Sequence, residues 1–173
     1  MKHKTQRPMD PLKTRPFKSP DAGAVSRIMK AAFKSFLGDK WTRLDEKYSS
    51  SMTILAQSTS RTPFGETASF VAVADDRILG YIRVTASAGG LGSLEVVGVD
   101  PSTFHKGVGK ALMKAGEVFW RRKKQRKVHT CVSSHNTRAL IYYVSHGFVP
   151  VGYHKDHFKA GVDEIILDRF LQP

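Results

Sequence analysis

The chain has 173 residues, one cysteine (Cys131), and 28 lysines and arginines against 15 aspartates and glutamates. This length fits one domain with a buried core, and a single cysteine excludes an intramolecular disulfide. The formal charge of +13 attracts anionic partners, either nucleic acid or a phosphorylated cofactor, and the lack of an apolar leader or long apolar run leads us to expect a soluble, cytoplasmic protein that makes no use of a membrane.

Two segments carry much of the excess positive charge. Residues 1–12 have no apolar periodicity and contain Pro8 and Pro11, which predicts a basic, disordered tail ahead of a single domain at residues 13–173. Residues 121–127 lie where a helix is expected to end, and their charge would stabilise the negative end of the helix dipole. We prefer this interpretation of residues 121–127 to a nucleic-acid-binding patch.

The first predicted elements are two helices. Ser19, Pro20 and Asp21 combine a capping hydroxyl, a first-turn proline and an acid ahead of apolar residues at helical spacing. This signal predicts a helix from about residue 20. A second amphipathic stretch runs from about residue 41 to 57, and the polar residues 58–66 that follow predict a loop.

Three strands are expected next. Residues 69–74 and 78–86 are rich in β-branched and aromatic side chains and are separated by a short turn, which predicts an antiparallel hairpin. Residues 94–99 form a third predicted strand that is closed by Pro101. Gly98 inside this strand predicts a β-bulge.

The remaining segments alternate between helix and strand. Apolar spacing predicts a helix over residues 107–123, followed by a strand at 128–132. A helix near residues 136–146 ends at Gly147, and two strands are expected at 148–153 and 164–171. The fold class is therefore mixed α/β.

The segment between the third strand and the following helix has the features of an anion site. The loop from His105 to Lys110 contains two glycines, Gly107 and Gly109, and two lysines, the first being Lys106. Free amides at a helix start bind phosphate, and glycines allow it to approach the backbone closely. The spacing fits neither a nucleotide P-loop nor the dinucleotide motif, and a purely structural turn explains this segment equally well.

Two motifs in this half of the chain support a more specific interpretation. They read Val99-x-Pro101-x-x-Phe104-x-x-Gly107-Val108-Gly109-x-x-Leu112 and Asn136-x-x-Ala139-x-x-x-Tyr143-x-x-x-Gly147-Phe148. In this order, and with residues 14–21 as a first strand and helix, they resemble the signatures of the Gcn5-related N-acetyltransferases (GNAT). The resemblance implies a mostly antiparallel mixed sheet of six to seven strands, about four flanking helices, and a splayed strand pair that forms the acetyl-CoA cleft.

The resemblance also implies an activity and a set of acetyl-CoA-binding residues. Acetyl-CoA would donate its acetyl group to a primary amine by direct attack in a ternary complex. The implied contacts are the backbones of Val97 and Val99, the loop residues Phe104, His105, Lys106, Gly107, Val108, Gly109 and Lys110, and the second-motif residues Asn136, Ala139 and Tyr143. Phe104 and His105 depart from the family, which usually has Gln or Arg and often Gly at these positions.

Two residues are candidates for proton transfer. The resemblance places Tyr143 as the general acid that protonates the leaving thiolate, and the alternative is a tyrosine packed on the helix. Glu95 is the candidate base because it interrupts an apolar strand, and the alternative is a glutamate that faces solvent. Cys131 is interpreted as a core residue. His154 and His157 lie in a loop where no metal is expected. Solvent exposure is the simpler interpretation of these histidines, and the alternative is contact with the substrate or a role as general base.

Other functions fit the same sequence. Residues 153–167 loosely resemble the C-terminal part of enzymes that acetylate protein N-termini, such as the ribosomal-protein alanine acetyltransferases. A protein of another class, a non-catalytic acetyl-CoA sensor or a nucleic-acid-associated module, would also use the positive charge. The expected partners are acetyl-CoA and an amine acceptor, in a monomer or homodimer.

Overall fold

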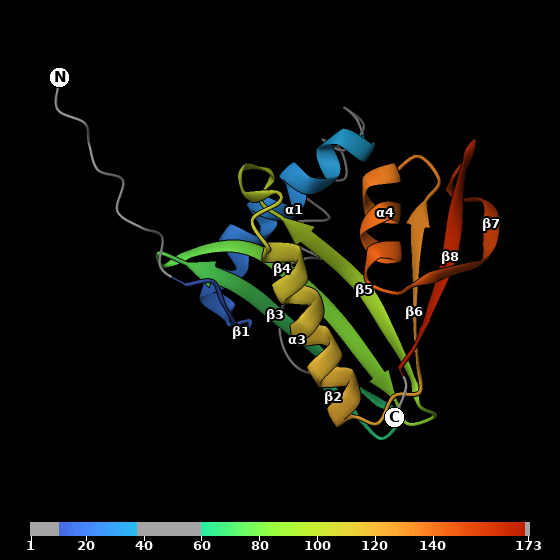
Figure 1. Cartoon of the computed structure of the whole chain (residues 1–173), viewed down its shortest axis with the longest axis horizontal. Coiled ribbons are helices and arrows are strands. Elements are labelled where there is room, and N and C mark those ends of the chain that lie inside the picture. The colour runs from blue at the N-terminus through green and yellow to red at the C-terminus, as the bar shows by residue number, and fades with distance from the viewer. Residues whose placement is uncertain (1–10, 38–59, 172–173) are drawn as a thin grey trace, which may run out of the picture.

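A computed structural model describes residues 11–37 and 60–171. These residues form an eight-stranded, mostly antiparallel sheet in the order β1-β3-β4-β5-β6-β8-β7, with β2 paired to β3 (Figure 1). The strands are β1 (Lys13–Pro16), β2 (Ser60–Thr62), β3 (Gly65–Ala74), β4 (Arg77–Ser87), β5 (Leu91–Val99), β6 (Lys127–Ser133), β7 (Val149–Lys159) and β8 (Val162–Phe170). The helices are α1 (Ala22–Leu37), α3 (Val108–Arg122) and α4 (Thr137–Ser145), with 3-10 turns η1 (Ser19–Asp21) and η3 (Pro101–Thr103).

This architecture confirms the predicted mixed α/β fold, with one or two strands more than expected. The two helices predicted after residue 100 and the helix predicted from about residue 20 are all present. The helix predicted at residues 41–57 and residues 1–10 of the predicted tail lie outside the described residues. Leu12, the last residue assigned to that tail, packs against the core.

Alternation along the strands divides the core between the two faces of the sheet. The larger cluster contains Leu112 and Trp120 of α3, and the smaller one contains Met29 of α1 with Val71 and Tyr81 of the central strands. Figure 1 shows α3 in front of the strands and α1 behind them. The central strands are therefore covered on both faces, which explains why β3 and β4 consist largely of apolar residues.

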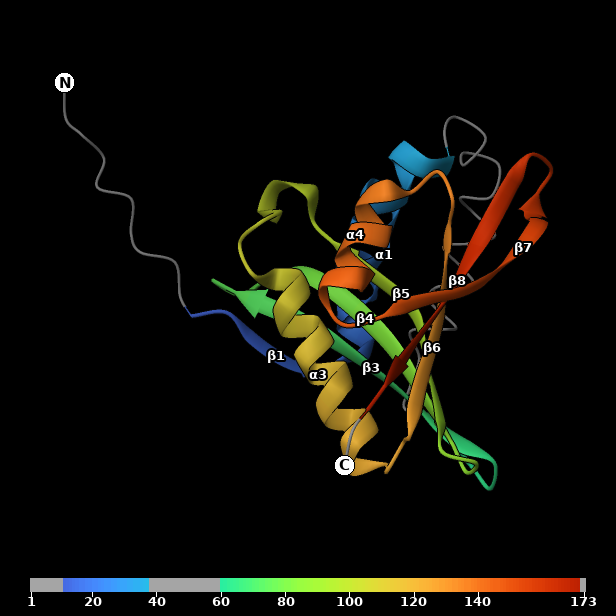
Figure 2. The ribbon, with the colours of Figure 1, turned by 45° about the vertical axis from the view of Figure 1, so that its right-hand side comes forward.

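Strands β5 and β6 separate soon after they meet. They run parallel and pair only at residues 91–93 and 127–129, and Figure 2 shows them diverging beyond this point. We call this point the fork. The Thr130 hydroxyl donates a 2.9 Å hydrogen bond to the Leu94 carbonyl immediately beyond it. The edge of β5 beyond Leu94 that faces β6 therefore has no strand partner among the described residues.

The bulge in β5 lies three residues before the predicted position. Arg83 and Val84 of β4 pair with Val96 and Leu94, so that Glu95 is the additional residue of the bulge. The prediction of a bulge at Gly98 was wrong. Gly98 instead allows α1 to approach the sheet, because a β-carbon there would lie 2.4 Å from the sulfur of Met29.

Hairpin boundaries also differ from the prediction. The predicted hairpin near residues 69–86 is confirmed, and Asp75 and Asp76 form its turn with φ values of 49° and 57°, which suits a two-residue hairpin turn. However, the predicted loop at 58–66 contains β2 and the start of β3. Residues 153–159, expected to be a loop, continue β7 because they pair with β8 across the same hairpin.

The basic segment at residues 121–127 ends α3, as predicted. It contains the last turn of that helix and the first residue of β6. Three of its cations pair with carboxylates, Arg121 with Glu117, Lys123 with Glu66 and Lys127 with Asp168. These ion pairs support the interpretation of a solvated helix end.

Candidate active site

The loop between β5 and α3 exposes an uninterrupted run of amides. Asp100 caps η3 by accepting a 2.9 Å hydrogen bond from the Ser102 amide, and the chain then turns through His105 and Gly107, whose φ values are 64° and 81°. Within the described residues, the amides of residues 107–110 donate no hydrogen bond. Together with the positive end of the α3 dipole, they form a site for an anion such as a diphosphate.

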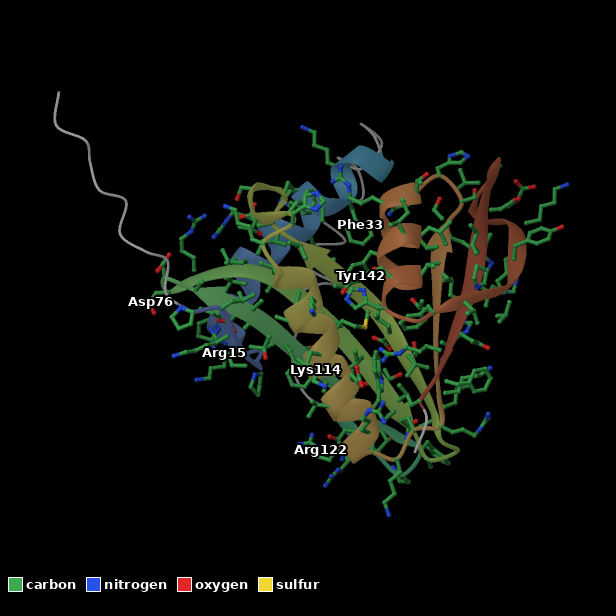
Figure 3. All side chains as sticks on the ribbon, viewed as in Figure 1. Arg15, Phe33, Asp76, Lys114, Arg122 and Tyr142 are labelled. Carbon is green, nitrogen blue, oxygen red and sulfur yellow. The ribbon has the colours of Figure 1, made fainter. Side chains whose placement is uncertain are left out.

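The two glycines of this loop have different roles. Gly107 has positive φ, and a β-carbon there would meet no atom within 4 Å, so the space in front of the amides is open. Gly109 lies against α4, because a β-carbon would be 2.9 Å from the Tyr142 ring. The Tyr142 hydroxyl donates a 2.8 Å hydrogen bond to the Gly109 carbonyl, and Figure 3 shows this side chain between α3 and α4. Gly107 keeps the anion site open, and Gly109 lets α4 dock beside it.

Phe104, which departs from the family motif, contacts a cation that the sequence analysis missed. The guanidinium carbon of Arg138, in the first turn of α4, lies 4.6 Å from the centre of the Phe104 ring. Such an arrangement is a cation–π interaction. It brings a positive side chain next to the loop at the position where the family usually supplies Gln or Arg. Because this contact joins residues 34 positions apart, no local pattern could have revealed it.

Tyr143 is buried beside the fork. Its side chain belongs to the larger core cluster with Phe148, and only 6% of its surface is exposed. Burial raises the pKa of Tyr143 to about 12, and a hydrogen bond with the Thr130 side chain opposes this shift. The phenol therefore keeps its proton at neutral pH and is able to donate it.

Glu95 lies on the bulge of β5, exposed to solvent and paired with a cation. Its carboxylate accepts a 2.6 Å hydrogen bond from Nε of Arg83. Nη1 of Arg83 is buried and has no hydrogen-bond partner among the described residues. Glu95 therefore lacks buried, apolar surroundings and faces solvent. Its role in proton transfer stays a prediction.

The second motif forms the start of α4. The Asn136 side chain accepts a 3.2 Å hydrogen bond from the Ala139 amide and so caps the helix. This structural role accounts for the spacing of the two residues. The predicted contact of either one with acetyl-CoA stays a prediction, as do the contacts of Val97 and Val99, which are half-buried beyond the fork on β5.

The histidines near the end of the chain lie on the β7–β8 hairpin. The exposed rings of His154 and His157 stack with centroids 4.7 Å apart, and Asp156 accepts a hydrogen bond from the Gly161 amide. In the part of the chain that the structure describes, no cluster of His, Cys, Asp or Glu could hold a metal ion.

One surface cavity lies at the β1 side of the sheet and reaches the β5–α3 loop at Asp100. Its volume is about 570 Å³, and its lining includes Arg15 of β1, Ile28 of α1 and Asp76 in the β3–β4 turn. Figure 3 shows Arg15 and Asp76 at the opposite end of the sheet from α4. We place the candidate active site between β5 and α4 instead, because the loop with the free amides contacts α4 through Gly109 and Tyr142, and the buried phenol of Tyr143 belongs to the same helix.

Known proteins resemble this chain in sequence and in fold. Residues 65–150 match the acetyltransferase (GNAT) domain family. A mycothiol acetyltransferase from Actinosynnema mirum is 40% identical over 73 residues, which cover 42% of this chain and 25% of that protein. The chain thus spans only a quarter of the length of this relative.

Two solved structures share the fold over nearly the whole chain. PaiA N-acetyltransferase from Thermoplasma acidophilum, crystallised with coenzyme A, has a TM-score of 0.71 at 16% identity and covers 93% of this chain and 99% of its own. The ribosomal-protein-S18-alanine N-acetyltransferase from Escherichia coli has a TM-score of 0.71 at 15% identity, with coverages of 94% and 96%.

Helices long and apolar enough to cross a membrane do not occur within the described residues. The matched domain family, the shared fold and the arrangement of loop, fork and phenol lead to one assignment. The chain belongs to the GNAT acetyltransferase superfamily.

Proposed function

We propose that this enzyme transfers the acetyl group of acetyl-CoA to a primary amine of a small molecule or peptide. The free amides at the start of α3, next to the unpaired edge of β5, are the observation that supports this proposal most directly. The diphosphate of coenzyme A would bind the amides of residues 107–110. The pantetheine arm would lie along β5 near Val97 and Val99, and the thioester would reach the fork.

In the proposed reaction the amine attacks the thioester directly. An alkyl ammonium with a pKa near ~10 first loses a proton, and the nitrogen lone pair then forms the new N–C bond as the C–S bond breaks. Tyr143 gives its proton to the departing sulfur, and the second proton of the nitrogen restores the phenol. The raised pKa of Tyr143 suits this role, since burial keeps the phenol protonated until the thiolate forms.

A carboxylate is the simplest base for the first proton. Glu95 is the candidate from the sequence, and its exposed carboxylate forms an ion pair with the Arg83 guanidinium. Replacing Glu95 with Gln tests this role through the pH dependence of kcat/KM. A changed profile would support Glu95, and an unchanged profile would place the base elsewhere.

Two acceptor classes fit the site. The relative of 40% identity acetylates a small molecule by its name, and the structural neighbour from Escherichia coli acts on a protein N-terminus by its name. We favour a small amine because the sequence match to the first is stronger. Acetylation of a protein N-terminus is the alternative within the same chemistry.

A thiol-release assay with acetyl-CoA tests the activity. The acceptors are spermidine, L-lysine, an aminoglycoside and a peptide with a free N-terminus, and calorimetry with coenzyme A measures the binding site separately. Release of coenzyme A that depends on one of these amines supports the proposal. The absence of both heat and thermal protection with coenzyme A and acetyl-CoA would refute it.

The non-catalytic, nucleic-acid-associated alternative has a separate test. Electrostatic binding to nucleic acid weakens steeply as salt concentration rises. A filter-binding assay with RNA and DNA between low and physiological salt would show this slope if the positive surface served that purpose. The ion pairs within residues 121–127 lead us to expect no such specific binding.

A further inference from the structure

One largely buried carboxylate near the fork has no counter-charge among the described residues. Glu164 of β8 is only 5% exposed, and no described residue donates a hydrogen bond to its side chain or forms an ion pair with it. Asp168, on the same strand and similarly buried, pairs with Lys127 and lies 3.1 Å from Nδ1 of His129. Burying an ionised carboxylate is costly unless a hydrogen bond or a counter-charge offsets it, so the surroundings of Glu164 differ from those of Asp168 in a way that affects its chemistry.

The strand register places Glu164 level with the open part of the fork, on the neighbouring strand of β6. It lies opposite Ser133 of β6 and His154 of β7, several residues beyond the last pair between β5 and β6. Strand alternation puts Glu164 on the face of the sheet opposite Leu167, which belongs to the core under α3 and α4. Cys131, two residues before Ser133 in β6, lies on the same face as Glu164.

Glu164 lies close enough to Cys131 and Tyr143 for its charge to affect both side chains. Burial is the main cause of the raised pKa values of Cys131 and Tyr143, and the charge of Glu164 raises both further. Burial likewise raises the pKa of Glu164 itself. The titratable groups facing it from the described elements are thus Cys131 of β6, Tyr143 of α4 and His154 of β7.

We propose that Glu164 is the general base that takes the first proton from the attacking ammonium. This inference rests on the acetyl transfer proposed above and assigns one of its steps. The ammonium proton moves to the Glu164 carboxylate, directly or through one water, and leaves to solvent after the amide has formed. Tyr143 protonates sulfur from the α4 face, and Glu164 receives the amine proton from the opposite face, so that acid and base do not exchange protons directly.

The cationic substrate also provides the missing counter-charge. A carboxylate that forms no ion pair with the described residues can bind an ammonium group without first breaking a pair of that kind. The carboxylates of Asp168 and Glu95 do not offer this, because their cations are already in place. We therefore expect the acceptor to arrive in its protonated form.

The test compares Glu164→Gln, Glu164→Asp and the matched control Asp168→Asn with wild type. Each variant is assayed by thiol release with acetyl-CoA and whichever of the four amines above wild type acetylates fastest, from pH 5 to 9. In wild type, kcat/KM should rise with pH as Glu164 ionises, with a pKa above the ordinary ~4.3 of glutamate. Glu164→Gln should lower kcat/KM at pH 7 by about 10² or more and abolish this rise of kcat/KM with pH.

The controls separate a lost base from a damaged fold. Glu164→Asp should keep the rise of kcat/KM with pH at a reduced rate. Asp168→Asn should keep the apparent pKa of this rise even if the protein becomes less stable. Calorimetry should give the same affinity of Glu164→Gln and wild type for coenzyme A. A pH profile of Glu164→Gln that coincides with wild type would overturn the inference and leave acetyl transfer intact, whereas a wild type inactive with all four amines would remove both.

Discussion

Substituting Gly107 with Val offers a direct test of the anion site. Gly107 has a φ of 81°, a conformation that costs an L-residue about 1–2 kcal/mol and is worse for a β-branched one. No atom lies within 4 Å of the position of the new β-carbon, so the isopropyl group would occupy the open space in front of the amides of residues 107–110. Hydrogen bonds to a charged group contribute about 1.5–3 kcal/mol each. The loss of one such bond should weaken coenzyme A binding by about 10- to 100-fold.

A matched control exists elsewhere in the chain. Gly161, in the β7–β8 turn, has a φ of 78° and also no atom within 4 Å of an added β-carbon. Gly161→Val should therefore lower the free energy of unfolding about as much as Gly107→Val does. Urea unfolding measures this stability, and calorimetry measures coenzyme A affinity for both variants. Equal affinities of the two variants for coenzyme A would refute the assignment of the diphosphate to the α3 loop.

Three further results are expected. Tyr143→Phe should lower kcat by about 10² without changing coenzyme A affinity, since only the acid is lost; stopped turnover with weakened affinity would contradict this role. Gly109→Ala should displace the Tyr142 ring, which would lie 2.9 Å from the new β-carbon, and lower the melting temperature. The hydrogen bond from Arg15 lowers the pKa of Asp21, so this stabilisation is present above the ordinary pKa of ~3.9 and is lost as pH falls through the lower folded value. Urea unfolding between pH 2 and 6 should show a shallower loss for Asp21→Asn.

The relation between Phe104 and Arg138 illustrates how a departure from a family motif can be compensated in space. The family position that usually holds Gln or Arg is occupied by an aromatic ring, and this ring holds a guanidinium from α4 next to the loop. The residue types have changed, while a cation remains near the anion site. A motif comparison alone registers only the loss.

Local patterns were sufficient for several elements. The glycine loop after β5, the capped start of α4 at Asn136 and the hairpin turn at Asp75 depend on residues a few positions apart, so their geometry follows from neighbouring side chains and backbone preferences. The same holds for the end of α3 in its basic segment. These elements made the superfamily recognisable before any tertiary contact was known.

Features that depend on contacts between distant segments required the tertiary structure. Gly98 in a strand is compatible with a bulge or with close packing, and only the position of Met29 in α1 decides between them. The bulge at Glu95 follows from the pairing of β4 with β5, and the position of Glu164 opposite Ser133 and His154 follows from the pairing of β8 with β6 and β7. Sequence patterns determine which segments form strands and helices, but the partner of each strand and the charges around each buried group are set by the packing of the whole chain.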